Sequence, residues 1–172
     1  MKREGQRLRR TTRKPVVGVM GPAKAGPREL GDAKLLGELI ARQGWVLLTG
    51  GRATGVMDAA SQGAKGVHGS LTVGVLPDTK TEVSRYVDIA IVTDMGNARN
   101  NVNVMSSDVI VACGLGGTGT VSEVALALKA KKPVILLDAD QSEVGLFRNL
   151  APDLVFSATS PEEAVKRIME LL

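Results

Sequence analysis

The stretch that most constrains the fold is V-I-V-A-C-G-L-G-G-T-G-T-V-S-E at residues 109–123. A run of apolar and β-branched residues, typical of a buried strand, is followed by glycines and threonines and then by a segment predicted to be helical over residues 121–132. Glycine lets a backbone approach a ligand closely, and the start of a helix presents free N–H groups and the positive end of its dipole. The pattern predicts a phosphate-binding loop between a strand and a helix.

Apolar segments of strand length alternate with segments of helical periodicity along most of the chain. We predict strands at residues 16–20, 45–49, 71–76, 87–92, 109–113, 134–137 and 154–156. We predict helices at residues 28–43, 56–65, 95–105, 121–132 and 143–150, with a last helix starting at residue 160. Continuously apolar strands separated by helices imply a parallel sheet that is covered on both faces. The expected fold class is α/β: a single doubly wound, mostly parallel, Rossmann-like domain spanning residues 15–172.

Glycine-rich turns follow several of the predicted strands. The turns at Gly21, Gly50 and Gly114 all leave the carboxyl end of a strand, and G-G-R-A-T-G at residues 50–55 also opens a helix. Ligands of doubly wound sheets bind at these carboxyl ends, beside the point where the strand order reverses. We therefore expect one crevice lined by all three turns, with the loops at 50–55 and 114–120 each able to bind an anionic group.

The basic charge of the chain is concentrated at its N-terminus. Residues 1–14 hold seven basic side chains and one acidic side chain, whereas the remaining 158 residues hold 15 basic and 17 acidic ones. The segment is polar and lacks apolar periodicity, so we predict a basic, disordered tail over residues 1–14. A nearly neutral body with only 2% aromatic residues disfavours a specific nucleic-acid surface built on base stacking.

Several other classes of protein are also disfavoured. No apolar run approaches the roughly 18 residues of a membrane span, and the tail has no apolar segment of a secretory signal. Cys113 is the only cysteine and the chain has one histidine, so we expect no disulfide and no metal site. A cytoplasmic protein without a membrane partner is the expectation.

Two arginines are candidate ligands for a phosphate. Arg52 lies in the second glycine-rich turn, and Arg99 lies beside Asn100 in an asparagine-rich segment. Arginine suits an oxyanion because its planar guanidinium can donate two hydrogen bonds at once. The simpler interpretation of Arg52 is a solvated loop charge.

Three further residues are candidates from their positions alone. Glu123 lies in the first turn of the helix after the glycine-rich loop, where an acid also compensates the helix dipole without any ligand. Lys24 and Asp138 lie in loops after predicted strands and are the weaker candidates.

Two motifs together resemble the LOG-like family, Rossmann-fold proteins that are often mislabelled lysine decarboxylases. G-G-T-G-T-V-S-E at 116–123 is similar to the family signature G-G-x-G-T-x-x-E, and T-G-G-R-A-T-G-V-M at 49–57 is similar to its second signature. Within that family the chain looks closest to the molybdenum cofactor carrier proteins. That likeness rests on K-P-V-V-G-V-M-G-P at 14–22, G-W-V-L-L-T-G-G-R at 44–52 and E-V-A-L-A-L-K-A-K-K-P-V at 123–134.

The resemblance implies a homo-oligomer, a tetramer or a dimer, that binds molybdenum cofactor of the molybdopterin type through its phosphate and pterin. It further implies storage, protection and delivery of that cofactor without chemical conversion, with molybdoenzymes or cofactor-synthesis proteins as partners. The expected cofactor-binding residues are Gly21, Lys24, Gly50, Gly51, Arg52, Gly55, Arg99, Asn100, Gly116, Gly117, Thr118, Gly119, Thr120 and Glu123.

Two alternatives stay open at this point. The chain also resembles the cytokinin-activating phosphoribohydrolases, which release a free base from a nucleoside monophosphate, and Arg99 and Glu123 would then be catalytic. Against this, Asn100 stands where those enzymes have a lysine, and Leu115 stands where they have a proline. The third possibility is dinucleotide binding, since residues 114–119 satisfy G-x-G-x-x-G and Asp138 ends the next strand, although that motif normally follows the first strand.

Overall fold

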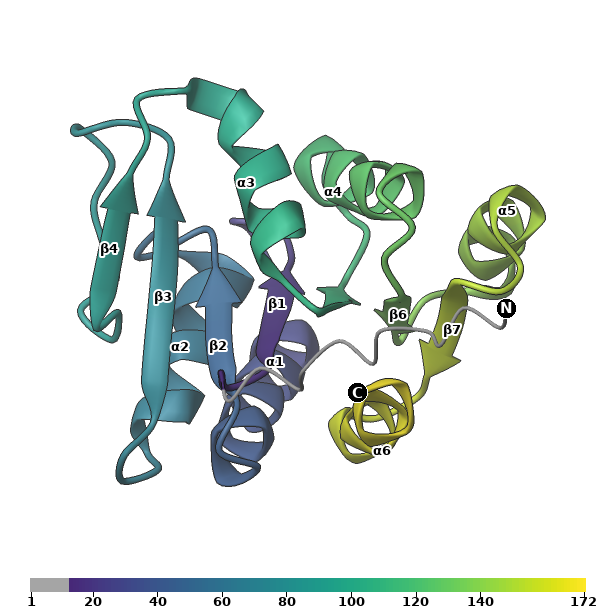
Figure 1. Ribbon diagram of the computed structural model, residues 1–172, viewed down its shortest axis with the longest axis horizontal. Helices are drawn as coiled ribbons and strands as arrows, with labels where there is room; N and C mark the ends of the chain where they lie inside the picture. The colour runs from purple at the N-terminus through teal and green to yellow at the C-terminus, as the bar shows by residue number, and fades with distance from the viewer. Residues whose placement is uncertain (1–12) are drawn as a thin grey trace, which may run out of the picture.

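Seven strands form one sheet at the centre of the computed structural model, which describes residues 13–172 (Figure 1). The strands are β1 (Val16–Met20), β2 (Val46–Thr49), β3 (Leu71–Leu76), β4 (Ile89–Val92), β5 (Val109–Cys113), β6 (Val134–Leu137) and β7 (Val155–Ala158). The helices are α1 (Pro27–Arg42), α2 (Gly55–Lys65), α3 (Arg99–Ser106), α4 (Thr118–Lys129), α5 (Gln141–Leu150) and α6 (Pro161–Leu171), and a 3-10 turn, η1 (Gly96–Ala98), precedes α3.

The strand order is β4-β3-β2-β1-β5-β6-β7, and every neighbouring pair is parallel. Val17 of β1 is paired with Leu47 on one side and with Val109 on the other. The chain therefore winds outward from β1 in both directions, and the strand order reverses between β1 and β5. This confirms the predicted doubly wound fold and brings the carboxyl ends of β1, β2 and β5 next to one another.

Helices cover both faces of the sheet, and each face has its own hydrophobic core. On one face, side chains of α1, α2 and α6 such as Leu36, Val56 and Ile168 pack on the strands. On the other, side chains of α3, α4 and α5 such as Val104 and Phe147 do so. The helices α3 and α4, which follow β4 and β5, lie side by side in Figure 1.

Element boundaries differ from the prediction at the polar segments. The helix predicted at residues 121–132 starts three residues earlier, because Gly117 is extended and Thr118 is already helical. The helix predicted at residues 95–105 is a 3-10 turn, η1, followed directly by α3, and Gly96, with a φ of +52°, prevents a regular helix from starting at residue 95. The helix predicted at residues 143–150 begins at Gln141, because Asp140 caps it through the amides of Ser142 and Glu143.

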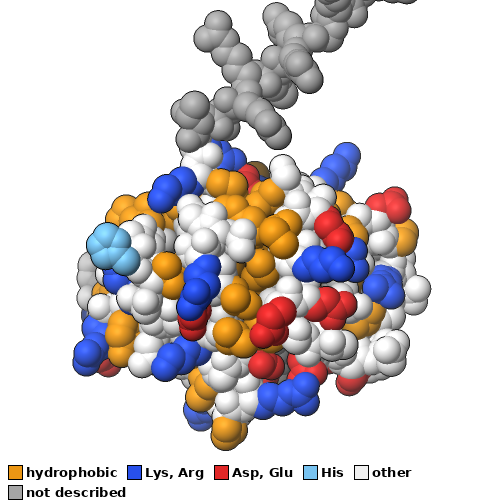
Figure 2. Space-filling view, turned by 90° about the horizontal axis from the view of Figure 1, so that it is seen from below, with side chains coloured by type: hydrophobic (Ala, Val, Ile, Leu, Met, Phe, Trp, Pro, Cys, Tyr) orange, Lys and Arg blue, Asp and Glu red, His pale blue; other side chains and the backbone are white. Residues whose placement is uncertain are grey.

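The predicted tail falls largely on residues 1–12, which lie outside the described residues. Arg13 is bound to the domain, because its guanidinium donates to both carboxylate oxygens of Asp108 at 2.9 and 2.6 Å. Figure 2 shows that the face seen there carries side chains of both charges around hydrophobic patches. Within residues 13–172, no helix is long and apolar enough to cross a membrane.

Candidate ligand-binding site

The N-terminus of α4 is an open donor site at the carboxyl end of β5. Gly117 occupies the N-cap position and provides no side-chain hydrogen bond, and the backbone N–H groups of Thr118, Gly119 and Thr120 donate to no acceptor within residues 13–172. By contrast, Ser160 caps α6 through its side chain. Free N–H groups and the positive helix dipole at one point form a site for an anion.

The glycines around these amides, Gly116, Gly117 and Gly119, are not crowded by other parts of residues 13–172. A Cβ atom added at Gly116 or Gly119 would meet no heavy atom within 4 Å, and one at Gly117 would only touch Pro22 at 3.7 Å. These three glycines are therefore not required by packing against the rest of the domain. They leave room for a ligand against the backbone, which a phosphate-binding loop requires.

Arg99 brings a positive charge to the same region from the start of α3. Its guanidinium lies against Gly50 at the carboxyl end of β2, where an added Cβ would collide with Nη1 and come within 2.9 Å of Nη2. Neither Arg99 nor the exposed Arg52 forms an ion pair with any of residues 13–172. Burial lowers the pKa of Arg99 and the charge of Arg52 lowers it further, whereas Glu123 opposes the shift. Two unpaired guanidinium groups near each other favour the binding of an anion.

Glu123 lies one turn into α4 and is 7% exposed. Its Oε1 accepts a hydrogen bond of 2.8 Å from Nδ2 of Asn103 on α3. Burial raises the pKa of Glu123, while the Asn103 hydrogen bond and the charge of Arg99 act in the opposite direction. The buried hydroxyl of Thr120, one turn before Glu123, has no hydrogen-bond partner in the described part of the chain. The site thus combines anion donors with one buried carboxylate and one free hydroxyl.

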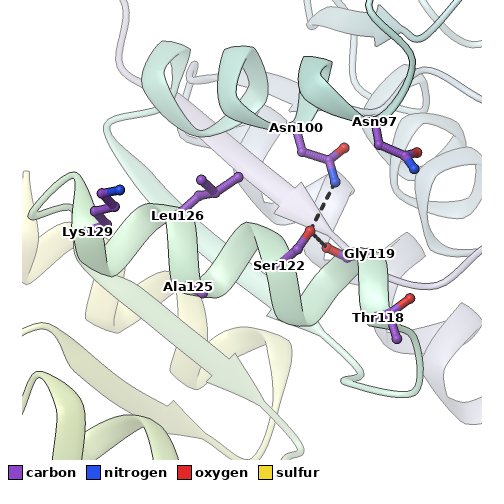
Figure 3. Close-up of a pocket in the computed structure, with 8 residues that line it drawn as sticks. All are labelled: Asn97, Asn100, Thr118, Gly119, Ser122, Ala125, Leu126 and Lys129. Atoms are coloured by element: carbon purple, nitrogen blue, oxygen red, sulfur yellow. Dashed lines mark hydrogen bonds between the residues drawn. The ribbon is translucent and has the colours of Figure 1, made fainter.

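A pocket of about 700 Å³ continues from the loop along the outer side of α4 (Figure 3). Asn97 and Asn100 line it on one side, and Nδ2 of Asn100 donates to Oγ of Ser122 at 3.2 Å. Thr118 and Gly119 border it at the loop, and the side chain of Lys129 is at its far end. The pocket therefore offers amide and hydroxyl groups next to the anion site.

Several of the expected residues have other surroundings. Gly21 lies against Val56 and the carbonyl of Cys113, and Gly55 lies against the carbonyls of Pro22 and Ala23. These two glycines allow close packing of the turns, and the N–H of Val56 at the start of α2 donates to the carbonyl of Pro22 at 3.1 Å. The second glycine-rich turn is therefore closed by protein at Gly55.

Two more expected residues, Gly51 and Lys24, and the weaker candidate Asp138 take little part in this arrangement. Gly51 is buried against β3, with its N–H donating to Oγ1 of Thr49 at 3.1 Å. Lys24 is exposed, and Asp138 pairs with Arg28 at 2.8 Å near the carboxyl end of β6. The side chain of Glu29 lies against Gly114. A carboxylate at the first glycine of the G-x-G-x-x-G motif disfavours a dinucleotide phosphate there.

Asn97, Asn103 and Ser122 were not among the residues expected from the sequence. The signal for Asn103 is its position four residues after Arg99, which places both side chains on the same face of α3. Its contact with Glu123 joins two different helices and has no signature in the sequence. The buried pair is visible only once α3 and α4 are packed together.

Comparison with known proteins places the chain in a family. Residues 14–165 match the SLOG cluster4 family. An uncharacterized protein of Archaeoglobus fulgidus is 46% identical over 121 residues, which cover 70% of this chain and 78% of the relative.

Two solved structures are similar over nearly their whole length. The molybdenum cofactor binding protein of Rippkaea orientalis has a TM-score of 0.90 and 56% identity, with 94% of this chain and 99% of that chain covered. The molybdenum cofactor carrier protein of Chlamydomonas reinhardtii has a TM-score of 0.87 and 48% identity, with 92% of this chain and 98% of that chain covered. The resemblance inferred from the two glycine-rich signatures is confirmed, and the chain belongs to the SLOG cluster4 family.

Proposed function

We propose that this protein binds the molybdenum cofactor, a molybdopterin-type ligand, and stores, protects and delivers it without chemical conversion. The observation that carries the proposal is the open N-terminus of α4 beside Arg99, a guanidinium without an ion-pair partner among residues 13–172. The likeness to the proteins of Rippkaea orientalis and Chlamydomonas reinhardtii supports the identity of the ligand.

The phosphate of the cofactor would be bound at the start of α4. The N–H groups of residues 118–120 supply donors, Gly116 and Gly117 leave the space, and the Thr118 hydroxyl adds a further donor. Arg99 would neutralise the negative charge, with Arg52 adding positive potential from the β2 turn. Gly50 belongs to this site because it makes room for the guanidinium of Arg99.

The pterin would be recognised by the polar groups next to the phosphate site. A pterin ring presents N–H donors on its 2-amino-4-oxo edge, and the carboxylate of Glu123 is an acceptor within reach of the loop. Asn100 and the adjoining pocket offer amide groups to the rest of the ligand. In this arrangement the anion site would bind the phosphate, and the buried carboxylate next to it would bind the pterin edge.

The phosphoribohydrolase alternative has weaker support. Arg99 and Glu123 are both at the site, as that reaction would require, but Asn100 and Leu115 stand where those enzymes have a lysine and a proline. The similar solved structures are those of a molybdenum cofactor binding protein and a molybdenum cofactor carrier protein. The arrangement favours Glu123 as a ligand contact.

We further propose that the protein is a homo-oligomer, a dimer or a tetramer, in the cytoplasm. All four residues of the edge strand β4 are exposed, and the side chains of Ile89, Ile91 and Val92 are 47%, 44% and 47% exposed. An apolar edge strand of this kind favours association with another chain. Delivery would then be to molybdoenzymes or cofactor-synthesis proteins.

One purified sample, divided in two, tests the proposed function. The first half is titrated with molybdenum cofactor, and we expect saturable binding that is lost in Arg99→Ala and kept in Arg42→Ala, a matched change on the exposed side of α1. The second half is incubated with AMP, and we expect no release of adenine. Rapid release of adenine by the wild-type protein would contradict the carrier function and favour the hydrolase.

A further inference from the structure

The carboxylate of Glu123 and the guanidinium of Arg99 are close enough to affect each other's pKa, yet they form no ion pair within residues 13–172. The carboxylate is instead held by Asn103, a fully buried residue of α3, through the 2.8 Å bond from Nδ2 to Oε1. Arg99 and Asn103 lie one helical turn apart, so the same face of α3 carries the cation and the group that engages the acid.

Asn103 is itself fixed by its neighbours. Its backbone carbonyl accepts a hydrogen bond of 2.8 Å from Oγ of the fully buried Ser107. Ser107 packs against β1 at Gly18, where any larger residue would collide with its side chain, and its carbonyl accepts a hydrogen bond from Nζ of Lys132. The backbone at Asn103 is therefore anchored, and from this position its buried amide donates to Glu123.

Two buried atoms beside this bond lack partners in the described chain. One is Oδ1 of Asn103 and the other is Oγ1 of Thr120, which lies on the same side of α4 as Glu123. Leaving a buried polar atom without a hydrogen bond is unfavourable, because the atom has lost its contact with water. The interface between α3 and α4 thus contains two oxygen atoms that could still form hydrogen bonds and that no residue of the described chain engages.

We propose that Asn103 is a positioning residue: it keeps the carboxylate of Glu123 away from Arg99, so that Arg99 stays free for the ligand phosphate and Glu123 stays free for a ring N–H. This inference rests on the proposed function, since it assigns one role to each end of a phosphorylated pterin. Without Asn103, the carboxylate can turn to the guanidinium and neutralise it. Both the anion site and the ring acceptor would then be lost together.

The arrangement also predicts which rings are preferred. Oε2 of Glu123 receives no hydrogen bond from residues 13–172, so it is the oxygen available to a ligand donor. A pterin has a 2-amino group at its pyrimidine edge, whereas a lumazine has a carbonyl oxygen in that place. A carboxylate attracts the first and repels the second, because two acceptors cannot share a hydrogen bond.

The test compares two probes, 6-hydroxymethylpterin phosphate and 6-hydroxymethyllumazine phosphate, by equilibrium titration of the full chain. We expect the wild type to prefer the pterin by about tenfold, as for a hydrogen bond to a charged group. Asn103→Leu should bind the lumazine about tenfold more weakly, through the loss of free Arg99, and the pterin about a hundredfold more weakly, so that the preference is lost. Asn101→Leu, at an exposed position of the same helix, should behave as the wild type.

A double variant separates positioning from simple structural damage. In Asn103→Leu/Glu123→Gln there is no carboxylate to neutralise Arg99, so affinity for both phosphates should recover while the preference for pterin stays absent. A double variant as weak as Asn103→Leu, or an Asn103→Leu protein that binds like the wild type, would overturn the inference. If the wild type binds neither molybdenum cofactor nor either probe, the proposed function fails and the inference with it.

Discussion

The guanidinium of Arg99 lies directly against the Cα of Gly50, which joins the start of α3 to the carboxyl end of β2. This contact holds a positive charge at the carboxyl end of β2, near enough to Glu123 of α4 for their charges to interact. Position 50 favours glycine because the guanidinium of Arg99 occupies the space that a Cβ atom would need.

Replacing Gly50 with alanine should therefore displace Arg99 with little damage to the fold. The atoms that a Cβ would meet are the ends of two flexible side chains, Arg99 and Met57, which can move. We expect a change in unfolding free energy within about 1 kcal/mol, together with a loss of cofactor affinity of about tenfold. Denaturation and titration on the same samples measure both effects. Gly31→Ala, on an open face of α1, is the control, and equal effects of the two changes would contradict this role of Gly50.

Placing a carboxylate at Gly117 should block the anion site while leaving the helix intact. Gly117 is the N-cap of α4 and has extended backbone angles, and aspartate is a favoured N-cap residue. Gly117→Asp should keep or raise the melting temperature yet abolish cofactor binding. Its carboxylate would accept hydrogen bonds from the same N–H groups that bind the phosphate, and its negative charge would repel the phosphate. Gly117→Asn caps the helix without the charge and should retain much more affinity. Undiminished binding by a folded Gly117→Asp protein would exclude the start of α4 as the phosphate site.

The sequence was sufficient to predict the layered fold, because the buried strands are continuous apolar runs such as V-I-L-L at 134–137. It also predicted a glycine-rich segment between β5 and a helix, since that pattern is local, while the binding roles of this segment and of Arg99 stay predictions. The start of α4 was predicted three residues late because glycine and threonine are weak helix formers, and only the extended Gly117 shows where the helix begins.

What the sequence did not indicate depends on contacts between distant segments. The pairing of Asn103 with Glu123 requires α3 and α4 to be packed together, and the closure of the β2 turn depends on carbonyls of Pro22 and Ala23 meeting Gly55. Asp138 has the spacing of a ribose ligand but is paired with Arg28. Spacing alone cannot distinguish these environments, because each is created by a neighbour from another element.

The stability of the protein should depend on the charge of Glu123. Burial raises its pKa above the ordinary value of 4.5, so the native state binds this proton more tightly than the unfolded state. The ionised carboxylate therefore destabilises the native state fully when the pH is above the pKa of Glu123 in the folded protein. This destabilisation disappears as the pH falls through that pKa and then through 4.5. Glu123→Gln should therefore be more stable than wild type at neutral pH, with the difference shrinking on acidification. Denaturant unfolding at several pH values measures this, and a difference that grows toward low pH would be inconsistent with it.

Asp108 should show the opposite dependence. Burial raises its pKa, but hydrogen bonds from Arg13 and from the Val16 amide outweigh this and hold the pKa below its ordinary 3.8. Its contribution to stability is present above pH 3.8 and is lost as the pH falls through the lower folded value. Asp108→Ala should cost about 1 kcal/mol at neutral pH through the Val16 hydrogen bond and leave cofactor affinity unchanged. A stability gap that persists below the folded pKa would show that the charge is not responsible.

The edge strand β4 should mediate self-association. Ile91→Lys places a charge in the middle of this exposed apolar strand, where it would oppose pairing with another chain. We expect the variant to shift toward a smaller species in light scattering coupled to size-exclusion chromatography, with its melting temperature nearly unchanged. Thr81→Lys adds the same charge in the loop before β4 and serves as the control, which should keep the mass distribution of the wild type. An unchanged mass distribution for Ile91→Lys would place the interface elsewhere.

The most direct test of the account is a crystal structure of the protein with molybdenum cofactor bound. We predict that the cofactor phosphate lies within hydrogen-bonding distance of the N–H groups of residues 118–120 and is contacted by Arg99, with the pterin edge turned toward Glu123. A cofactor bound elsewhere, with the start of α4 facing only solvent, would contradict the proposed binding site.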